Sequence, residues 1–190
     1  SRAASANRRS GQSAMFIILS AMTRLLAPIL TFTSEEVWEA LPVWSKKGES
    51  VHLTQFPEID KNYFDEELGR RWSAMIEAKG EIAKAIEQAR REKVIGHSLD
   101  ARITIAAPEN LRNLLATHLD ELRALLIVSQ LAVADGKDIP GAYESEEIKG
   151  LAVRVEKARG TKCERCWIFD QSVGENPQHP TICSRCAENL

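Results

Sequence analysis

All four cysteines of this 190-residue chain lie within its last thirty residues, as two Cys-x-x-Cys pairs. The pairs are Cys163–Cys166 and Cys183–Cys186, and sixteen residues separate them. A two-residue gap lets one tight turn direct two sulfurs at a single metal ion, and the longer gap lets the chain return with the second pair. The spacing therefore predicts one structural zinc ion held by four thiolates, which would order a segment too polar to order itself.

Two other uses of these cysteines are a disulfide framework and an iron–sulfur or rubredoxin-like iron site. A disulfide framework is disfavoured because the first 162 residues contain no cysteine and nothing before the pairs resembles a signal peptide. His179 is a spare ligand candidate, but four cysteines already complete a tetrahedron. The longest apolar run, residues 14–19, is too short to span a membrane. We therefore expect a cytoplasmic protein with no membrane partner.

The formal net charge of −2 does not by itself mark a nucleic-acid-binding protein. The charges are unevenly distributed, because residues 1–30 carry four arginines and no acid, and residues 70–102 carry eight Lys or Arg against five acids. Their local charges are thus +4 and +3. These segments could present a basic face to a polyanion, or they could be solvated helix surface. Charge alone favours the solvated surface.

Two helices are predicted in the first sixty residues. Residues 5–30 carry apolar residues at helical spacing on more than one face, which predicts a buried helix that Pro28 kinks or ends. Thr33 and Glu36 form a capping-box pattern, which predicts the start of a second helix. Residues 51–56 alternate in polarity and predict a short extended segment.

The longest helix is predicted over residues 64–93, with Gly96 as its stop signal. It is followed by segments whose pattern changes between strand and helix. Alternating or aliphatic residues predict three strands, and Pro108 opens another helix between the first two. In chain order these are a strand over 101–106, a helix over 108–122, a strand over 125–133, a loop over 135–149 and a strand over 150–158.

The predicted fold class is mainly α with a small α+β part. We expect a truncated helical bundle over residues 1–60, then an α+β linking domain with about three strands and long helices over 61–159. A four-cysteine zinc-binding tail follows over 160–190.

The order of several motifs resembles the anticodon-binding region of class I aminoacyl-tRNA synthetases, and in particular the bacterial isoleucyl-tRNA synthetase family. The resemblance covers nearly the whole chain. The motifs that carry it are the Arg-Arg-Ser-x-Gln run at residues 8–12, Leu-Ala-Pro-Ile-Leu at 26–30, Phe-Thr-Ser-Glu-Glu-Val-Trp at 32–38, Gly-His-Ser-Leu-Asp-Ala at 96–101, the segment 122–129, and Lys-Cys-x-Arg-Cys-Trp at 162–167.

This resemblance implies the C-terminal region of an enzyme that activates isoleucine with ATP and joins it to tRNA-Ile. The family's His-Ile-Gly-His and Lys-Met-Ser-Lys-Ser signatures are absent, and residues 95–97 match the first of them only in part. ATP and isoleucine would therefore bind in a catalytic domain outside this chain, and the editing domain is missing too. We expect a non-catalytic fragment of a monomeric parent. The first bundle helices would also be absent, so exposed helix faces could let the fragment self-associate.

The resemblance also implies which residues contact the anticodon arm. Arg8 and Gln12 would share a helix face. Arg9 would lie about a third of a turn away, and Ser5 one turn before Arg9. The alternative is a solvated helix start. In the tail, Trp167 could stack on a base or cover the zinc site, and the arginine within the first knuckle could approach a phosphate or offset thiolate charge. The expected RNA-binding residues are Ser5, Arg8, Arg9, Gln12, Arg165 and Trp167.

Two other protein classes compete with this interpretation. A similar four-cysteine knuckle closes DNA glycosylases of the formamidopyrimidine type, but those begin with a catalytic proline, whereas this chain begins with Ser1 and carries the Arg-Arg motif. DNA is therefore not an expected partner. The second alternative is a zinc-stabilised protein-interaction module without nucleic acid.

Overall fold

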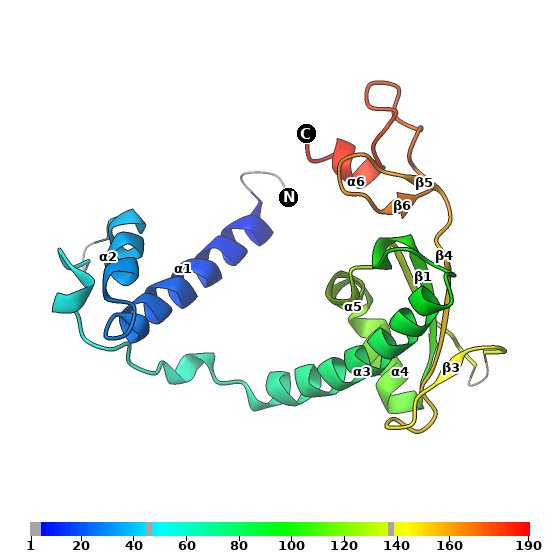
Figure 1. The fold of residues 1–190 in the computed structure, drawn as a ribbon, viewed down its shortest axis with the longest axis horizontal. Helices are drawn as coiled ribbons and strands as arrows, with labels where there is room; N and C mark the ends of the chain where they lie inside the picture. The colour runs from blue at the N-terminus through cyan, green and yellow to red at the C-terminus, as the bar shows by residue number, and fades with distance from the viewer. Residues whose placement is uncertain (1–4, 45–46, 137–138) are drawn as a thin grey trace. The chain divides into compact units, whose positions relative to one another are not determined.

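The computed structural model describes residues 5–44, 47–136 and 139–190, and it divides into two compact units (Figure 1). The first unit is Ser1–Phe64 and the second is Asp65–Leu190. Within the described residues, no helix combines the length and the apolar character that a membrane crossing needs. Each unit is described by itself below.

The first unit consists of two α-helices and two 3-10 helices around a small aromatic core. Trp38 is 2% exposed, its indole nitrogen donates to the carbonyl oxygen of Gly48 at 2.9 Å, and its ring meets that of Trp44 edge-on at 5.3 Å. Phe16 also packs edge-on against Trp44, with ring centroids 5.2 Å apart. The elements are α1 (Ala6–Leu26), α2 (Thr31–Ala40), η1 (Val51–Leu53) and η2 (Lys61–Tyr63).

The predicted capping box at Thr33 and Glu36 is wrong. Helix α2 already begins at Thr31, after Leu30, and no side chain caps it. The reason lies in the backbone: the N–H of Leu30 donates to Leu26 at 2.7 Å, and the N–H of Ser34 donates to Leu30 at 2.8 Å. This hydrogen-bonded turn joins α1 to α2 and places Thr33 inside the helix.

The extended segment predicted over 51–56 is also wrong at its start, since residues 51–53 form η1. The Ser50 hydroxyl caps this turn by accepting from the N–H of His52 at 3.2 Å. The Glu35 carboxylate accepts from the N–H of Val51 at 3.1 Å and from the Ser50 hydroxyl at 2.8 Å. These local bonds outweigh the weak preference of alternating polarity for a strand.

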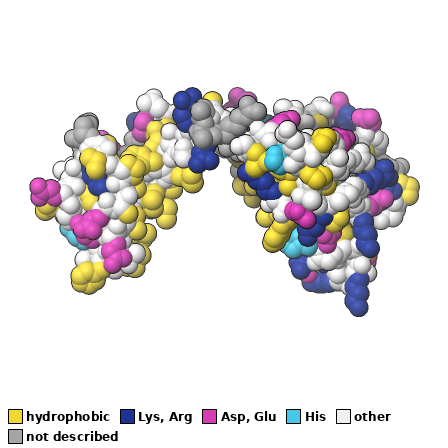
Figure 2. Space-filling view, turned by 90° about the horizontal axis from the view of Figure 1, so that it is seen from above, with side chains coloured by type: hydrophobic (Ala, Val, Ile, Leu, Met, Phe, Trp, Pro, Cys, Tyr) yellow, Lys and Arg dark blue, Asp and Glu magenta, His cyan; other side chains and the backbone are white. Residues whose placement is uncertain are grey.

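Helix α1 is not the buried helix that its apolar content predicts. Its buried residues are Ser20 and Thr23, while Met15, Ile18 and Met22 are 49–63% exposed. Apolar side chains are therefore gathered on the surface of this unit, which is the left-hand one in Figure 2. The expectation that apolar helix faces are exposed in this chain is thus met by α1.

The second unit packs helices against a four-stranded sheet of order β2-β1-β4-β3. Strands β1 and β2 are parallel and are joined by a helical crossover, whereas β4 runs antiparallel to β1 with Ile103 opposite Val155. The elements are α3 (Glu66–Arg91), η3 (Ser98–Asp100), β1 (Ala101–Ala106), α4 (Glu109–Thr117), α5 (Leu119–Leu126), β2 (Gln130–Val133), β3 (Tyr143–Glu144), β4 (Ala152–Lys157), β5 (Thr161–Lys162), β6 (Phe169–Asp170) and α6 (Ser184–Ala187).

Helix α3 supplies the largest apolar face against this sheet. Its N-cap is Asp65, whose carboxylate accepts from the N–H of Leu68 at 2.8 Å. The helix contributes a row of small and aliphatic residues at helical spacing to the core, and this spacing explains its amphipathic pattern. The buried residues of the row are Met75, Ala78, Ile82, Ala85, Ile86 and Ala89.

One charged residue, Glu81, interrupts that row and is 5% exposed. Its carboxylate accepts from the Lys84 ammonium at 2.6 Å, from the Ser145 hydroxyl at 2.6 Å and from the Tyr143 hydroxyl at 3.4 Å. The buried charge is therefore paired and hydrogen-bonded, as burial of a carboxylate requires. These bonds tie the β3 segment to α3.

Several boundaries in the second unit differ from those predicted. The helix over 108–122 is broken at His118 into α4 and α5, and the strand over 125–133 is confined to Gln130–Val133. Ile127, in the left-handed region with a φ of 54°, separates α5 from that strand. The loop over 135–149 contains β3, which makes four strands in this sheet rather than three.

The prediction that Gly96 ends the longest helix is also wrong, since α3 ends at Arg91. Lys93, not Gly96, has the left-handed conformation that follows the helix, with a φ of 59°. The strands expected over 101–106 and 150–158 are present as β1 and β4. The coarse fold class, helices with a small sheet and a cysteine-containing tail, is confirmed.

The tail is joined to the sheet through Ser129, which is 3% exposed. Its hydroxyl donates to the carbonyl oxygen of Leu99, just before β1, and accepts from the N–H of Phe169 in β6 at 2.7 Å. A second link lies nearby, where the Gln130 amide exchanges hydrogen bonds of 2.8 and 3.0 Å with the Arg159 backbone. The tail and the sheet are thus joined by hydrogen bonds on both sides of β5.

Candidate metal centre and RNA-contact residues

The structure brings all four cysteines together. Each offers one sulfur, and the four sulfurs lie within 4.8 Å of one another. Cys163 and Cys183 are fully buried, and Cys186 is 7% exposed. A tetrahedral site with Zn–S bonds of about 2.3 Å has sulfurs about 3.8 Å apart, and the sulfurs of Cys166 and Cys183 are 3.8 Å apart. The donor set and its dimensions fit a four-thiolate zinc ion.

Tight backbone turns hold each pair in place. In the first knuckle, the N–H of Trp167 donates to the carbonyl oxygen of Cys163 at 2.8 Å, and Trp167 closes the turn with a φ of 66°. In the second, the N–H of Ala187 donates to the carbonyl oxygen of Cys183 at 3.0 Å at the start of α6. The N–H of Cys183 also donates to the Cys163 sulfur at 3.3 Å, which links the two knuckles.

Cys163 and Cys186 differ in acidity. Burial opposes ionisation of Cys163, but the N–H groups of Cys166, Cys183 and Arg165 outweigh it and lower the pKa of the thiol to about 6. Burial, together with the neighbouring thiols, raises the pKa of Cys186 to about 12. The site therefore favours ionisation of Cys163 but opposes that of Cys183 and Cys186 in the absence of a cation, so a divalent metal supplies the charge that full ionisation requires.

The two arginines of the knuckles contact the cysteine turns. The Arg165 guanidinium donates to the carbonyl oxygen of Cys186 at 2.8 Å and so bridges the knuckles. A hydrogen bond with the Cys166 sulfur raises the pKa of Arg185. The Arg185 cation therefore offsets thiolate charge, whereas Arg165 joins the two turns through a carbonyl oxygen and remains exposed.

Trp167 does not cover the cysteines. The partly buried side chains packed against them are Ile168, Val173 and Ile182. The Trp167 ring is 60% exposed, with the Lys162 ammonium 5.5 Å from its centroid. An exposed aromatic ring beside a cation is an arrangement suited to stacking on a base.

The expected contact residues of the first unit lie on the first turns of α1. Ser5 is the N-cap, and its hydroxyl accepts from the N–H of Arg8 at 3.3 Å. Arg8, Arg9 and Gln12 are exposed, no acid lies in the first turn, and no ion pair among the described residues includes either arginine. Cations at a helix N-terminus oppose the helix dipole by about 0.3–1 kcal/mol each, so the fold alone does not account for them.

The structure therefore groups the expected RNA contacts in two places. Ser5, Arg8, Arg9 and Gln12 share one helix start in the first unit, whereas Arg165 and Trp167 share one knuckle in the second. Sequence reasoning missed Ser129, whose only signal was a hydroxyl between the apolar residues Val128 and Leu131.

Comparison with known proteins identifies two families along the chain. Residues 1–105 match the family described as the anticodon-binding domain of tRNA ligase, and residues 160–189 match the zinc finger found in FPG and IleRS. The zinc finger is shared by two classes of protein and does not separate them. The first match covers more than half of the chain and favours the tRNA ligase over the glycosylase.

Similar proteins agree with this assignment. The chain is 45% identical over 184 residues to the isoleucine–tRNA ligase of Syntrophotalea carbinolica, which is 96% of this chain and 19% of that protein. It is 42% identical over 189 residues to the ligase of Geobacter sulfurreducens, and 43% identical over 189 residues to that of Caldicellulosiruptor saccharolyticus. These matches cover 98% and 99% of this chain, and it spans about a fifth of each of these relatives.

The resemblance to isoleucyl-tRNA synthetases drawn from the sequence motifs is therefore confirmed. Neither match includes a domain described as catalytic. The chain belongs to the family of tRNA-ligase anticodon-binding domains, joined here to a zinc finger of the type found in isoleucyl-tRNA synthetases.

Proposed function

We propose that this chain is the part of an isoleucine–tRNA ligase that binds the anticodon arm of tRNA-Ile. The observation that carries the proposal is the presence, in one chain, of an anticodon-binding family match over residues 1–105 and a four-sulfur cluster within 4.8 Å. ATP and isoleucine would bind elsewhere in the ligase, and this chain would catalyse no step. Its contribution would be to position the tRNA so that the acceptor end reaches the catalytic domain.

The four cysteines would hold one structural zinc ion, Cys163 and Cys166 from one turn and Cys183 and Cys186 from the other. When bound, the ion supplies the positive charge and the cross-link that stabilise the tail. The chain itself supplies two further contributions. Backbone N–H groups stabilise the Cys163 thiolate, and Arg165 bridges the two turns.

Recognition would rest on two groups of side chains. Arg8 and Arg9 would contact phosphates, and Gln12, on the face of Arg8, would present an amide to an unstacked base. Ser5 would position them as the helix cap. Trp167 would stack on a base, with Arg165 beside it at the knuckle. The exposed ring of Trp167 supports this assignment. Arg8 and Arg9 support it too, because both are exposed and form no ion pair among the described residues.

The wider setting follows from the same proposal. The parent would be a cytoplasmic monomer, and the chain would divide into a bundle part over 1–60, a linking domain over 61–159 and the tail over 160–190. The exposed apolar face of α1 would make the chain by itself self-associate, which sedimentation at increasing concentration measures.

The test separates tRNA docking from amino-acid activation in the full-length ligase that carries this chain. Replacing both Cys163 and Cys183 with serine removes one ligand from each knuckle. We expect loss of isoleucine transfer to tRNA-Ile, while isoleucine-dependent ATP–pyrophosphate exchange is retained because it needs no tRNA.

The matched control is Ser184→Ala, at an exposed residue of α6 next to Cys183, which alters one hydroxyl but no sulfur. It should keep both activities. Equal loss of transfer and exchange in the cysteine variant would contradict the proposal, since the tail would then support the whole enzyme rather than tRNA docking.

A further inference from the structure

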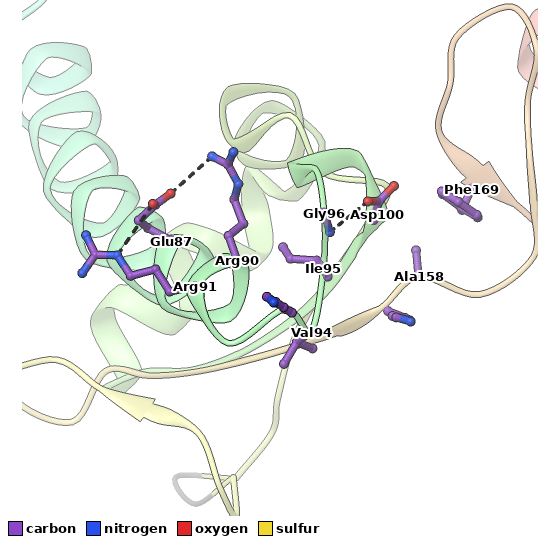
Figure 3. A pocket seen from close by; sticks show the side chains of 11 residues that line it. Glu87, Arg90, Arg91, Val94, Ile95, Gly96, Asp100, Ala158 and Phe169 are labelled. Atoms are coloured by element: carbon purple, nitrogen blue, oxygen red, sulfur yellow. Dashed lines mark hydrogen bonds and ion pairs between the residues drawn. The ribbon is translucent and has the colours of Figure 1, made fainter.

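A cavity of about 700 Å³ lies in the second unit, where the end of α3 meets the ends of β4 and β6. Its apolar lining comes from three separate segments: Val94 and Ile95 after α3, Ala158 after β4, and Phe169 in β6. Figure 3 shows Phe169, the first residue of β6, across from Asp100 and Ala158. Cavities of this size are typical of small-ligand sites.

Charged residues also line the cavity, and cations exceed acids. The lining includes four cations and two acids, a formal charge of +2; the cations are Arg90, Arg91, Lys93 and Lys157, and the acids are Glu87 and Asp100.

Both acids already have partners. Glu87 lies between Arg90 and Arg91, at 3.3 and 3.8 Å, as the dashed lines in Figure 3 show. The Asp100 carboxylate accepts from the N–H groups of Gly96 and His97 at 3.2 and 2.8 Å.

The two lysines differ from the arginines in having no counter-charge. Lys93 and Lys157 take part in no ion pair among the described residues. Lys93 also occupies the left-handed backbone region, where glycine is favoured. A helix dipole accounts for cations at the end of α3, but it does not account for Lys157 or for the apolar lining.

The walls of the cavity are fixed relative to one another. The N–H of Ala158 donates to the carbonyl oxygen of Asp100 at 2.7 Å, which joins the β4 wall to the α3–β1 connection. Ser129 joins the Phe169 wall to Leu99 by its two hydrogen bonds. The cavity is thus formed in the folded chain before any ligand enters, which lowers the cost of ordering on binding.

We propose that this cavity binds one unpaired nucleotide of the tRNA, with its base against Phe169 and Val94 and its phosphate held by Lys93 and Lys157. The inference rests on the proposed function and adds a third contact region to α1 and the first knuckle. An aromatic ring and an aliphatic surface match the face of an unstacked base, and two exposed ammonium groups that form no ion pair among the described residues match a phosphate. An acidic peptide would use the cations but not the aromatic wall.

The test measures affinity of the full-length ligase for a transcript of tRNA-Ile at several salt concentrations. Lys93→Gly removes an ammonium while placing glycine at a left-handed position, so the fold is retained. We expect weaker binding and a slope of log affinity against log salt that is smaller by about 0.7–0.9, the change for one phosphate contact. Phe169→Leu keeps an apolar side chain but removes the ring, and it should weaken binding about tenfold with the salt slope unchanged.

The matched control is Lys79→Ala, an exposed lysine on α3 that does not line the cavity. It should change neither the affinity for tRNA-Ile nor the salt slope, and zinc content and circular dichroism verify that each variant is folded.

Unchanged affinity in both cavity variants, with wild-type ligase still preferring tRNA-Ile over a non-cognate tRNA, would overturn this inference and leave the proposed function intact. A wild-type ligase without that preference would instead overturn the proposed function. Binding of poly-glutamate that Lys93→Gly weakens and that leaves tRNA binding unchanged would assign the cavity to an acidic peptide and also overturn the inference.

Discussion

Two glycines of the tail have the same backbone conformation but different surroundings. Gly160 has a φ of 98° and Gly174 a φ of 102°. A Cβ on Gly160 would lie 2.5 Å from the Asp170 carbonyl group, whereas a Cβ on Gly174 would meet nothing within 4 Å. Gly160 therefore permits the close pairing of β5 with β6, and Gly174 serves only its own turn.

This difference gives a residue-scale prediction. Gly160→Ala should weaken zinc binding by about tenfold or more, because the added methyl group separates the strands that carry the first knuckle. Gly174→Ala should lose only about 1–2 kcal/mol of local stability from its positive φ and should bind zinc nearly as well as the wild type. Competition with a chromophoric chelator measures the zinc affinity of both variants. Equal losses of zinc affinity would show that the positive φ, and not the contact with Asp170, determines the effect.

At this scale the knuckles were the most predictable feature and the cavity was the least. Two Cys-x-x-Cys pairs specify their own geometry, since each turn involves only a few neighbouring residues. The cavity instead combines residues near 90, 157 and 169, and no local pattern relates them. Sequence reasoning recognised the positive charge of residues 70–102 but not its concentration at the end of α3.

Among the elements, α3 depends on an internal charge. Glu81 lies in the apolar row of the helix, and its bonds with Lys84 and Ser145 keep it ionised. The pKa of Glu81 is lowered, chiefly by the hydrogen bond from Lys84 and then by that from Ser145. Burial opposes this shift but does not cancel it.

The pH dependence of stability follows from that direction. A carboxylate whose pKa is lower in the folded state stabilises the fold above its unfolded pKa and loses this effect as pH falls through the folded value. Glu81→Gln should therefore lower the melting temperature at pH 7 by several degrees, and the difference from wild type should shrink below about pH 4.5. Thermal melts from about pH 7 to pH 3 measure it.

Glu77→Gln is the control, because Glu77 is exposed on the same helix. The effect of Glu77→Gln on the melting temperature should be small over the whole pH range of the melts. A wild-type minus Glu81→Gln difference that stays constant across the pH range would mean that ionisation of Glu81 does not contribute, and that only the shape of its side chain does.

Element types were predictable where the periodicity was clear. The alternation over 101–106 and 150–158 gave strands in both places, as β1 and β4. The strand predicted over 125–133 is absent before Gln130, because a short aliphatic run is compatible with a buried strand and with a helix. Leu125 and Leu126 instead end α5, which packs against α3, α4 and β2 as part of the crossover between parallel strands.

At the scale of the whole molecule, the two units have different sources of stability. The second unit has a large core of helix and sheet residues, whereas the first has a small core of four buried residues, Ala27, Trp38, Leu41 and Val51. Composition supports a substantial core but does not say how it is divided between units. The exposed face of α1 could therefore be expected only from the family resemblance, and its apolar sequence alone predicted burial.

The Ser129 hydroxyl has a consequence for the order in which the chain folds. Its partners are thirty and forty residues away, at Leu99 and Phe169. Their meeting requires the parallel pairing of β1 with β2, which is slow because a long loop must close first. Zinc capture needs only residues 163–186, so metal uptake should precede docking of the tail.

Pulsed hydrogen exchange during refolding with zinc tests this order. The amide of Cys163, which donates to Ile168 within the knuckle, should become protected early. The amide of Phe169, which donates to Ser129, should become protected only with the amides of β1. Simultaneous protection of the two amides would contradict this order; a delay between them would mean that the tail acquires its metal as an independent module and docks onto the sheet afterwards.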